Sequence, residues 1–314
     1  MKFSAETVKT CAREAGFSAC GIAAAQKVED WRVKQVRRWL DAGRHGCMDY
    51  LSRHFEMRAD PSLLVPGVRS IICVTLNYYP SESQQEPTYH FARYAYGQDY
   101  HDVVRGKLRK LQEKLGLTGR AFCDTAPVDE RYWAWRSGLG WLGRNTQLIV
   151  PHAGSYFFLG ELMVTEEADV YDEPIASRCG TCRACIEACP AHALSVDEGL
   201  DARRCLSYLT IESREALPPE AVKQMGDCVY GCDRCAEVCP WNRFAQPTEE
   251  TAFKPRDDFL KMKMADWQQL TREAYQKLFK GSAVKRAKYE GLMRNIWGIS
   301  KVRIPEEENE EPDS

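Results

Sequence analysis

Apolar and polar positions follow helical spacing and strand spacing in turn along the first 165 residues. Residues 4–16 have the helical period, with Ser4 as the candidate N-cap and Gly16 as the candidate terminating residue. Residues 69–79 form a largely apolar run rich in β-branched side chains, which is typical of a buried central strand. The alternation favours an α/β or α+β domain. The same patterns predict further helices at 29–42, 100–115 and 129–137, and further strands at 17–25, 120–123, 147–150 and 155–165.

The pattern changes near residue 166, where an acidic, proline-containing stretch is typical of a domain boundary. Residues 179–240 are dense in cysteine and have few core positions of their own. Residues 254–304 are predicted to be helical and are basic, with 13 Lys and Arg against 5 Asp and Glu. The last ten residues hold six acidic side chains and no basic ones, so we expect them to be disordered. We therefore expect the parts 1–165, 166–245, 246–304 and 305–314.

Composition narrows the class of protein. The 314 residues are 44% hydrophobic and 28% charged, which excludes a disordered, collagen-like or coiled-coil chain. No apolar run approaches the roughly 20 residues that span a bilayer, and the N terminus lacks an apolar signal segment. We expect a reduced, cytoplasmic monomer without membrane contact.

Cysteine is the unusual component, with 14 residues, nine of them between Cys179 and Cys239. In a reduced compartment such a cluster indicates metal binding. The scattered cysteines are expected to be small buried hydrophobic residues: Cys11, Cys20, Cys47, Cys73 and Cys123.

The first cysteine motif has the spacing C-x2-C-x2-C-x3-C-P. Three thiolates at this spacing bind three corners of a cubane cluster, and the fourth binds a second cluster. A zinc site is the alternative, but zinc knuckles normally use two C-x2-C pairs, so the spacing favours iron–sulfur. The motif consists of Cys179, Cys182, Cys185, Cys189 and Pro190.

The second motif, Cys232, Cys235, Cys239 and Pro240, repeats the last three positions of this pattern. Either Cys205 or Cys228 completes it, and we favour Cys205 because Cys228 would share a very tight loop with Cys232. In two-cluster ferredoxins the last cysteine of each motif crosses to the other cluster. One [4Fe–4S] cluster then takes Cys179, Cys182, Cys185 and Cys239, and the other takes Cys189, Cys232 and Cys235 with one of the two candidates.

A glycine pattern at 138–143 matches G-x-G-x-x-G, the dinucleotide fingerprint. That fingerprint follows a strand and opens a helix, whereas here a predicted helix precedes it and a predicted strand follows. We therefore expect a tight loop.

Asp124 follows the predicted strand 120–123. A carboxyl at a strand end can face a cleft, and apolar neighbours would raise its pKa and keep it protonated near neutral pH. An N-cap role for the next helix is an equal alternative. The nearby aromatic residues suit a core, or the walls of a pocket for a large flat cofactor: Tyr132, Trp133, Trp135 and Trp141.

Taken together and in order, several motifs resemble the epoxyqueuosine reductases, cobalamin-dependent enzymes that complete queuosine in tRNA. The resemblance extends from about residue 4 to residue 300. It is carried by Arg58-x-Asp60-Pro61, RYAYGQDYHDV from Arg93, DTAPVDER from Asp124, GWLGRN from Gly140, YGCDRCAEVCPWN from Tyr230 and GSAVKRAKYEGLMRN from Gly281.

This resemblance implies an α+β fold: an α/β-type cobalamin-binding catalytic domain (1–165), a ferredoxin-like domain with two [4Fe–4S] clusters (166–245), and a short helical segment (246–304). It implies reduction of the substrate epoxide at the tRNA wobble position, with Asp124 as the proton donor. It assigns Cys205, not Cys228, to the second cluster. The implied cobalamin contacts are Arg58, Ala92, Asn145, Leu148, Leu159 and Ser207.

The chain departs from the family pattern in two places. Some members have a cysteine near the cobalt where this chain has Ala92. Longer members end in HEAT-like repeats that help to hold tRNA, so here we expect tRNA to bind the basic surface within 254–303, including Lys285 and Arg286. An unidentified external donor would supply the electrons.

Two other classes share some of these features. A ferredoxin-type electron-transfer protein would have the clusters without a corrinoid. A corrinoid reductive dehalogenase would have the same cofactors, but such enzymes typically carry a twin-arginine signal, which this sequence lacks.

Overall fold

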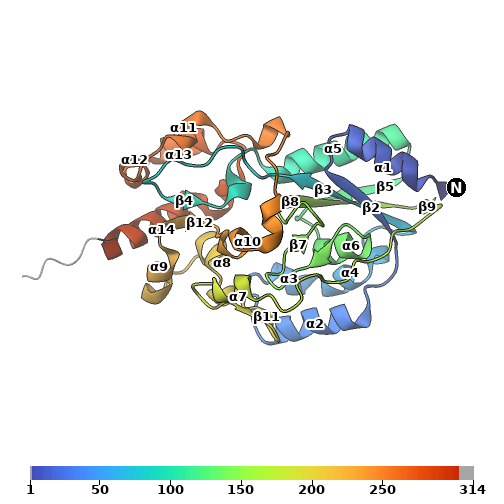
Figure 1. Cartoon of the computed structure of the whole chain (residues 1–314), viewed down its shortest axis with the longest axis horizontal. Coiled ribbons are helices and arrows are strands. Elements are labelled where there is room, and N and C mark those ends of the chain that lie inside the picture. Colours follow the sequence, from blue (N-terminus) through green and yellow to red (C-terminus); the bar gives the residue numbers. More distant parts are fainter. Residues whose placement is uncertain (1, 304–314) are drawn as a thin grey trace, which may run out of the picture.

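A four-stranded sheet organises the first half of the chain in the computed structural model, which describes residues 2–303 (Figure 1). Each neighbouring pair of strands, in the order β2-β3-β8-β5, is antiparallel. The expected α+β class is therefore confirmed, but the α/β-type first domain is wrong, because alternating helices and strands along a chain do not decide strand direction. The strands are Ala19–Ala24 (β2), Ser70–Asn77 (β3), Gly119–Phe122 (β5) and Phe157–Val164 (β8).

The two faces of this sheet bury different side chains, because successive strand residues point to opposite faces. Ile72 and Val74 of β3 share a core with α1 (Ala5–Glu14) and α5 (Tyr100–Leu115). Ile71 and Cys73 share another with α6 (Glu130–Arg136). Figure 1 shows α1 and α5 on one side of the sheet and α6 on the other.

Shorter elements surround the sheet. β1 (Lys2–Phe3) pairs in parallel with β9 (Glu167–Ala168). β6 (Trp141–Leu142) and β7 (Leu148–Ile149) form an antiparallel pair. The glycine pattern at 138–143 consists of the turn after α6 and of β6, so the predicted tight loop is confirmed for its first part. The remaining elements of this half are α2 (Asp30–Asp41), α3 (Tyr50–Arg53), α4 (Phe55–Ala59) and the 3₁₀ turns Pro61–Leu63 and Arg93–Ala95.

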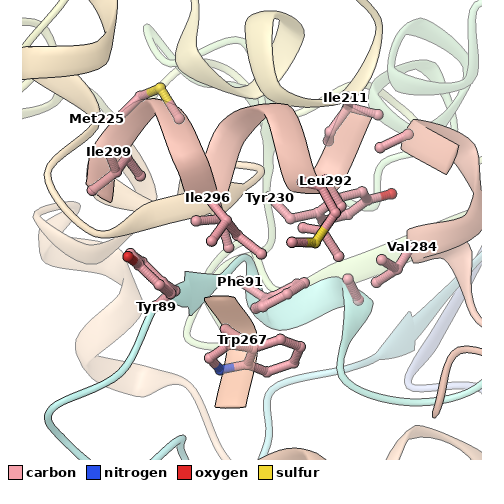
Figure 2. Close-up of a cluster of buried hydrophobic side chains, with 14 of the residues drawn as sticks. Tyr89, Phe91, Ile211, Met225, Tyr230, Trp267, Val284, Leu292, Ile296 and Ile299 are labelled. Atoms are coloured by element: carbon pink, nitrogen blue, oxygen red, sulfur yellow. The ribbon is translucent and has the colours of Figure 1, made fainter. Parts of the chain in front are cut away.

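A further apolar core joins the middle of the chain to its C-terminal helices (Figure 2). β4 (His90–Phe91) pairs in parallel with β12 (Cys228–Tyr230). The Phe91 ring lies 6.0 Å from the Tyr230 ring and 4.8 Å from the Trp267 ring. Residues 89–96 therefore pack with the second half of the chain, although they come early in the sequence.

The second half consists of short helices and two-residue strands, and the helical prediction for its C-terminal part is confirmed. The helices are α7 (Ala184–Glu187), α8 (Leu206–Ile211), α9 (Pro219–Met225), α10 (Arg234–Glu237), α11 (Asp257–Leu260), α12 (Met264–Gln268), α13 (Arg272–Leu278) and α14 (Lys288–Arg303). β10 (Leu194–Ser195) pairs with β11 (Gly199–Leu200), and 3₁₀ turns form at Ala202–Arg204, Pro240–Phe244, Thr251–Phe253 and Ala283–Ala287. The predicted acidic tail, 305–314, lies outside the described residues.

The acidic stretch after residue 165 remains attached to the first sheet. Asp169 accepts a hydrogen bond from the backbone N–H of Ala5 at 2.8 Å. Asp172 accepts from Lys9 Nζ at 2.6 Å and from the backbone N–H of Ile22 at 2.8 Å. These carboxylates therefore satisfy donors of the N-terminal elements, and the contacts of the first domain extend past residue 165.

The scattered cysteines differ in burial. Cys73 and Cys123 are buried as predicted, whereas Cys11 and Cys20 are half-buried. Cys47 is exposed, so its predicted burial is wrong: it lies in the loop between α2 and α3, where its Sγ is 3.6 Å from the Glu212 carbonyl oxygen. Within residues 2–303, no helix combines the length and the hydropathy needed to cross a bilayer.

Candidate active site

Asp124 lies directly after β5, on the loop that leads to α6. Its φ of 54° is in the left-handed region, which residues other than glycine seldom adopt. The carboxylate faces the start of α5, where the Tyr100 hydroxyl donates a hydrogen bond to Oδ2 and His101 Nε2 lies 3.3 Å from the same oxygen. The side chain is 55% exposed, so the carboxylate is held and still accessible. Asp129 is the N-cap of α6, so the alternative cap role of Asp124 is wrong.

His101 is held on its other side by Asp99. Its Nδ1 lies 2.6 Å from Asp99 Oδ1, and Asp99, the N-cap of α5, also accepts from the backbone N–H of His101. Partial burial acts to lower the pKa of His101, but hydrogen bonds to Asp124 and Asp99 outweigh it and raise the pKa to about 9. The ring is therefore an imidazolium at neutral pH, and both of its nitrogens donate.

The pKa of Asp124 is lowered rather than raised. Burial acts to raise this pKa, but the hydrogen bonds from His101 and Tyr100 favour the carboxylate and prevail. The prediction of a protonated Asp124 is therefore wrong for this arrangement, in which the proton is on His101. The sequence argument considered the apolar neighbours of Asp124 along the chain, and it did not include the two donors at the start of α5.

Two carboxyl groups lie on the other side of Asp124. Glu130, the first residue of α6, accepts a hydrogen bond from the backbone N–H of Asp124. Glu161, in the middle of β8, is 0% exposed, and neither of its carboxyl oxygens has a hydrogen-bond partner of normal geometry. Burial, followed by the charge of a neighbouring carboxylate, raises the pKa of Glu130 to about 8 and that of Glu161 well above its usual range. Both are therefore protonated at neutral pH.

Glu130 and Glu161 were not among the residues singled out from the sequence. A signal was present for Glu161, because it is the one acidic residue in the otherwise apolar strand Phe157–Val164. An unpaired carboxyl in such a position is costly to bury, which distinguishes it from an ordinary strand residue.

Three of the predicted cobalamin contacts lie on the α6 side of the sheet. Arg58, in α4, donates from Nη1 to the Val128 carbonyl oxygen at 2.6 Å, while its buried Nε has no partner. Leu148 of β7 and Leu159 of β8 share one apolar cluster on this side. The unpartnered guanidinium N–H of Arg58 offers a donor that a polar cofactor group can use.

The other three predicted contacts lie against the second cysteine motif. Asn145 lies after β6, and its Nδ2 is 3.4 Å from the Cys235 carbonyl oxygen. Ala92 packs on Gly231 so closely that a Cβ at Gly231 would be 2.5 Å from the Ala92 Cβ. Ser207 is in α8, and its carbonyl oxygen accepts a hydrogen bond from Thr210, whose hydroxyl accepts from the backbone N–H of Gly231.

The cysteines form two neighbouring groups of free thiols. Burial, followed by the proximity of Cys239, Cys179 and Cys182, raises the pKa of Cys185. Cys205 is affected in the same way, by burial and then by the proximity of Cys232 and Cys189. These neighbours match the two predicted ligand sets. Among residues 2–303, no three His, Cys, Asp or Glu side chains converge as they would around a single metal ion. This does not conflict with a cubane cluster, because each thiolate there binds a different iron.

Side chains of the second motif also tie the cluster region to the first sheet. Asn242 Oδ1 accepts from the backbone N–H of Ser155, just before β8, at 2.7 Å. The same side chain donates from Nδ2 to the Ala236 carbonyl oxygen in α10 at 2.7 Å. Asp233 accepts from the backbone N–H of Arg93 at 2.8 Å. The cluster region is therefore held against the start of β8 and the turn that begins at Arg93.

The basic C-terminal segment contains both paired and unpaired cations. Arg286 forms a two-pronged ion pair with Glu212 at 2.8 and 2.7 Å, and its guanidinium lies over the Tyr50 ring. Arg286, which we expected to contribute to the tRNA-binding surface, is therefore engaged in an ion pair within the protein. A cavity of about 640 Å³ opens beside it and is lined by Arg272, Tyr275, Gln276, Lys285, Lys288, Tyr289 and Glu290.

Comparison with known proteins matches two families to these regions. The family described as "Epoxyqueuosine reductase QueG, DUF1730" matches residues 58–125, and the "4Fe-4S double cluster binding domain" matches residues 178–242. The chain is 44% identical to the epoxyqueuosine reductase of Cellulophaga algicola over 93% of its own length and 96% of that protein. It is 39% identical to the Escherichia coli enzyme, of which it covers 79%.

Solved structures agree with this assignment. The chain is similar to an epoxyqueuosine reductase in complex with an epoxyqueuosine-modified tRNA-Tyr stem loop, with a TM-score of 0.85 and 27% identity over 94% of this chain and 80% of that one. A Bacillus subtilis epoxyqueuosine reductase, with its aspartate-bearing catalytic loop swung out of the active site, matches with a TM-score of 0.84 at 27% identity over the same shares. On the sequence identities and the span of the matches, the chain belongs to the epoxyqueuosine reductase family.

Proposed function

We propose that this chain carries out the family reaction in full: it converts epoxyqueuosine to queuosine at the wobble position of tRNA, using cobalamin and two [4Fe–4S] clusters. The observation that carries the proposal is the acid group at Asp124, which is held by Tyr100 and His101 in a domain that hydrogen bonds from Asn242 and Asp233 tie to the cluster region. The family membership and the tRNA stem loop bound by a related structure support it.

The ligand sets that we propose for the clusters follow the two cysteine groups. One set takes three cysteines from the first motif and the last cysteine of the second, and the other takes two from the second motif, the last cysteine of the first, and Cys205 from outside both. Cys228 lies beside Cys232 and remains free in this assignment. The sets are Cys179, Cys182, Cys185 and Cys239, and Cys189, Cys205, Cys232 and Cys235.

Cobalamin, when bound, would supply the redox chemistry for reduction of the epoxide. The residues that we propose to hold it lie around Asp124 and along the cluster region, and the unpartnered N–H of Arg58 supports this placement. They are Arg58, Ala92, Asn145, Leu148, Leu159 and Ser207. An external protein or small-molecule reductant would supply the electrons.

The protein's own chemical task is proton delivery. Loss of the epoxide oxygen needs a proton, because an alkoxide is a poor leaving group. His101 carries a proton, and its Nε2 lies 3.3 Å from Asp124 Oδ2. Asp124 is the more exposed residue of the two. We propose that substrate binding excludes water, raises the pKa of Asp124 and moves this proton onto Asp124, which donates it to the oxygen.

The tRNA-facing surface that we propose is the cavity lined by Arg272, Lys285 and Lys288. Lysine and arginine side chains neutralise backbone phosphates, and Lys285 and Lys288 line this cavity beside Arg272, which also pairs with Glu290 at 2.6 Å. The Lys285→Glu, Lys288→Glu double variant should bind an anticodon stem loop about tenfold more weakly in 0.1 M salt and show a shallower salt dependence. Lys277→Glu is the matched control, because Lys277 is exposed on α13 and does not line the cavity.

The decisive test is product formation by the purified protein. We expect anaerobic protein with reconstituted clusters and cobalamin to convert epoxyqueuosine in a tRNA stem loop to queuosine, measured by mass spectrometry of the nucleosides. Iron, sulfide and cobalt analysis should give two clusters and one corrinoid per chain. Full cofactor content without any queuosine would refute the proposal, and clusters without cobalt would favour a ferredoxin-type carrier.

The functional division that we propose remains 1–165 for catalysis, 166–245 for the clusters and 246–304 for RNA contact. The packing crosses these limits, since residues 89–96 join the C-terminal core. We also propose that the protein acts as a cytoplasmic monomer.

A further inference from the structure

Reduction of an epoxide to an alkene consumes two electrons and two protons and releases the oxygen as water. This inference rests on the proposed function. The His101–Asp124 pair holds one proton at neutral pH. A second proton must therefore reach Asp124 during the same turnover, while the substrate covers the exposed side of the carboxylate.

Two carboxyl groups lie on the inner side of Asp124, Glu161 within β8 and Glu130 at the start of α6. Glu161 is opposite Cys73 on β3 and Phe122 on β5, so its side chain points to the α6 face of the sheet. Glu130 lies close enough to act on Glu161 as a hydrogen-bonding neighbour, although the geometry of that contact is not that of a normal hydrogen bond. Glu130 in turn accepts from the backbone N–H of Asp124.

Packing alone does not account for this pair. A carboxyl that is 0% exposed and lacks a normal hydrogen bond destabilises the folded state, and a leucine or methionine would fill the same apolar face without that cost. Strained or costly groups of this kind occur mostly at functional sites. Glu161 lies on the inner side of Asp124, where a buried, protonated carboxyl can serve as a source of protons.

We propose that Glu130 and Glu161 form an internal proton reserve that reloads Asp124 within one turnover. In the first half, one C–O bond of the epoxide breaks, and the proton from the His101–Asp124 pair goes to the oxygen, which becomes a hydroxyl. Glu130 then passes a proton to the Asp124 carboxylate, and the protonated Glu161 beside it shares its proton with the carboxylate that is left on Glu130. In the second half the other C–O bond breaks, Asp124 protonates the leaving hydroxyl, and water and the alkene form.

The balance of this sequence is one epoxide, two electrons and two protons to one alkene and one water. The electrons are those that the reductase activity already supplies. Bulk solvent reloads the reserve through Asp124 and His101 after the product leaves.

The charged and titratable groups around the reserve allow it to give up a proton. Arg131 and His101 favour ionisation of Glu130, whereas the nearby carboxylate of Asp124 opposes it. Glu161 is influenced by Glu130, Asp124 and Asp129, and it in turn acts on the buried thiols of Cys73 and Cys123. The inner carboxyl therefore holds its proton firmly, and the outer one exchanges it more readily.

The test uses fully loaded enzyme in single-turnover reactions with an epoxyqueuosine-containing stem loop. Glu130→Gln retains an oxygen acceptor for the Asp124 N–H, and Glu161→Gln conserves volume, but neither can pass on a proton. Each should slow queuosine formation about tenfold at pH 7.5, with a larger solvent deuterium isotope effect. The deficit should shrink below pH 6, where solvent supplies protons more readily.

Thr75→Val is the matched control. Thr75 is fully buried in the same sheet and its hydroxyl also lacks a partner, so this variant removes an unpaired polar atom without removing an acid. It should keep the wild-type rate and isotope effect. Infrared spectra of the protein as purified should show a protonated-carboxyl band that disappears in Glu161→Gln, and this readout needs no turnover.

Folded, loaded glutamine variants with wild-type rates and isotope effects at pH 7.5 would overturn the proposal, and so would an unchanged carboxyl band. If the wild-type enzyme makes no queuosine, the proposed function fails instead, and the infrared band still reports whether the buried pair holds its proton.

Discussion

The two sides of Asp124 have opposite electrostatic character. On the outer side, Tyr100 and His101 at the start of α5 donate to the carboxylate and hold it ionised. On the inner side, Glu161 is fully buried without a hydrogen-bond partner, and burial raises the pKa values of Glu161 and Glu130, which remain protonated. The loop that carries Asp124 therefore has the charged pair His101–Asp124 on its outer side and the neutral pair Glu130–Glu161 on its inner side.

This difference shows that partners, rather than residue type, decide the charge of a carboxyl group. Asp124 has two hydrogen-bond donors and is more than half exposed. Glu161 has neither a donor nor contact with water. Desolvation determines the charge state where no donor opposes it, and donors determine it where they are present.

Removing the acid at the centre of the comparison should have the largest effect. Asp124→Asn cannot donate a proton from its side chain, so queuosine formation should fall about 10²- to 10⁴-fold. Single-turnover mass spectrometry, with iron and cobalt content as the control, checks this. Turnover at the wild-type rate would remove Asp124 from the proton-donating role.

Removing the outer proton source should have the next largest effect. His101→Gln should lower the rate about 10- to 100-fold, since Asp124 loses its nearest donor. Because the pKa of His101 is raised to about 9, wild-type activity should persist at neutral pH and decline as the pH rises through 9. The variant should lack this decline in a pH–rate profile. A decline retained in the variant would assign it to another group.

The inner side should affect stability with a defined pH dependence. Unfolded Glu161 and Glu130 ionise above pH 4.5, whereas in the fold their raised pKa values keep them protonated, for Glu130 until about pH 8. Wild-type stability should therefore be greatest below pH 4.5 with respect to these groups and fall as the pH rises toward 8.

Glu161→Gln should remove part of that fall, so its stability relative to wild type should rise by about 1–2 kcal/mol between pH 4.5 and pH 8. Urea denaturation at the two pH values measures the difference. A difference that does not change with pH would show that Glu161 is ionised in the fold.

The smallest effect is expected from Tyr100→Phe. Loss of the hydroxyl removes one donor to Asp124, which raises the pKa of Asp124 and makes it a weaker acid that is more often protonated. Because these consequences oppose each other, the rate should change about fivefold or less at pH 7.5. A change as large as that of Asp124→Asn would indicate that Tyr100 itself donates the proton.

Local patterns predicted much of the secondary structure. The helix at 100–115 has those limits in the fold, and the strand predicted at 69–79 is β3 at Ser70–Asn77. Both depend on side-chain periodicity and on caps within a few residues, such as Asp99 before α5 and Gly116 after it. Strand direction and pairing depend on residues far apart in the chain, so the antiparallel sheet was not predicted.

The candidate site divides in the same way. The motifs located Asp124 and the cysteine groups, because their spacing is a local property of the chain. The charge state of Asp124 was predicted wrongly, since the donors that control it belong to α5. Arg286 was assigned to the basic surface from its sequence position, and the fold pairs it with Glu212, 74 residues away.

The sequence by itself identified the family and the candidate residues for its chemistry, which are the crossed cysteine motifs and Asp124. Only the tertiary structure decided where the protons are. It brought the start of α5 to one side of Asp124, and α6 and β8 to the other, and left Glu161 without water or donors. The physical reason is that a charge state depends on the solvent and partners around a group in space, which neighbours along the chain do not specify.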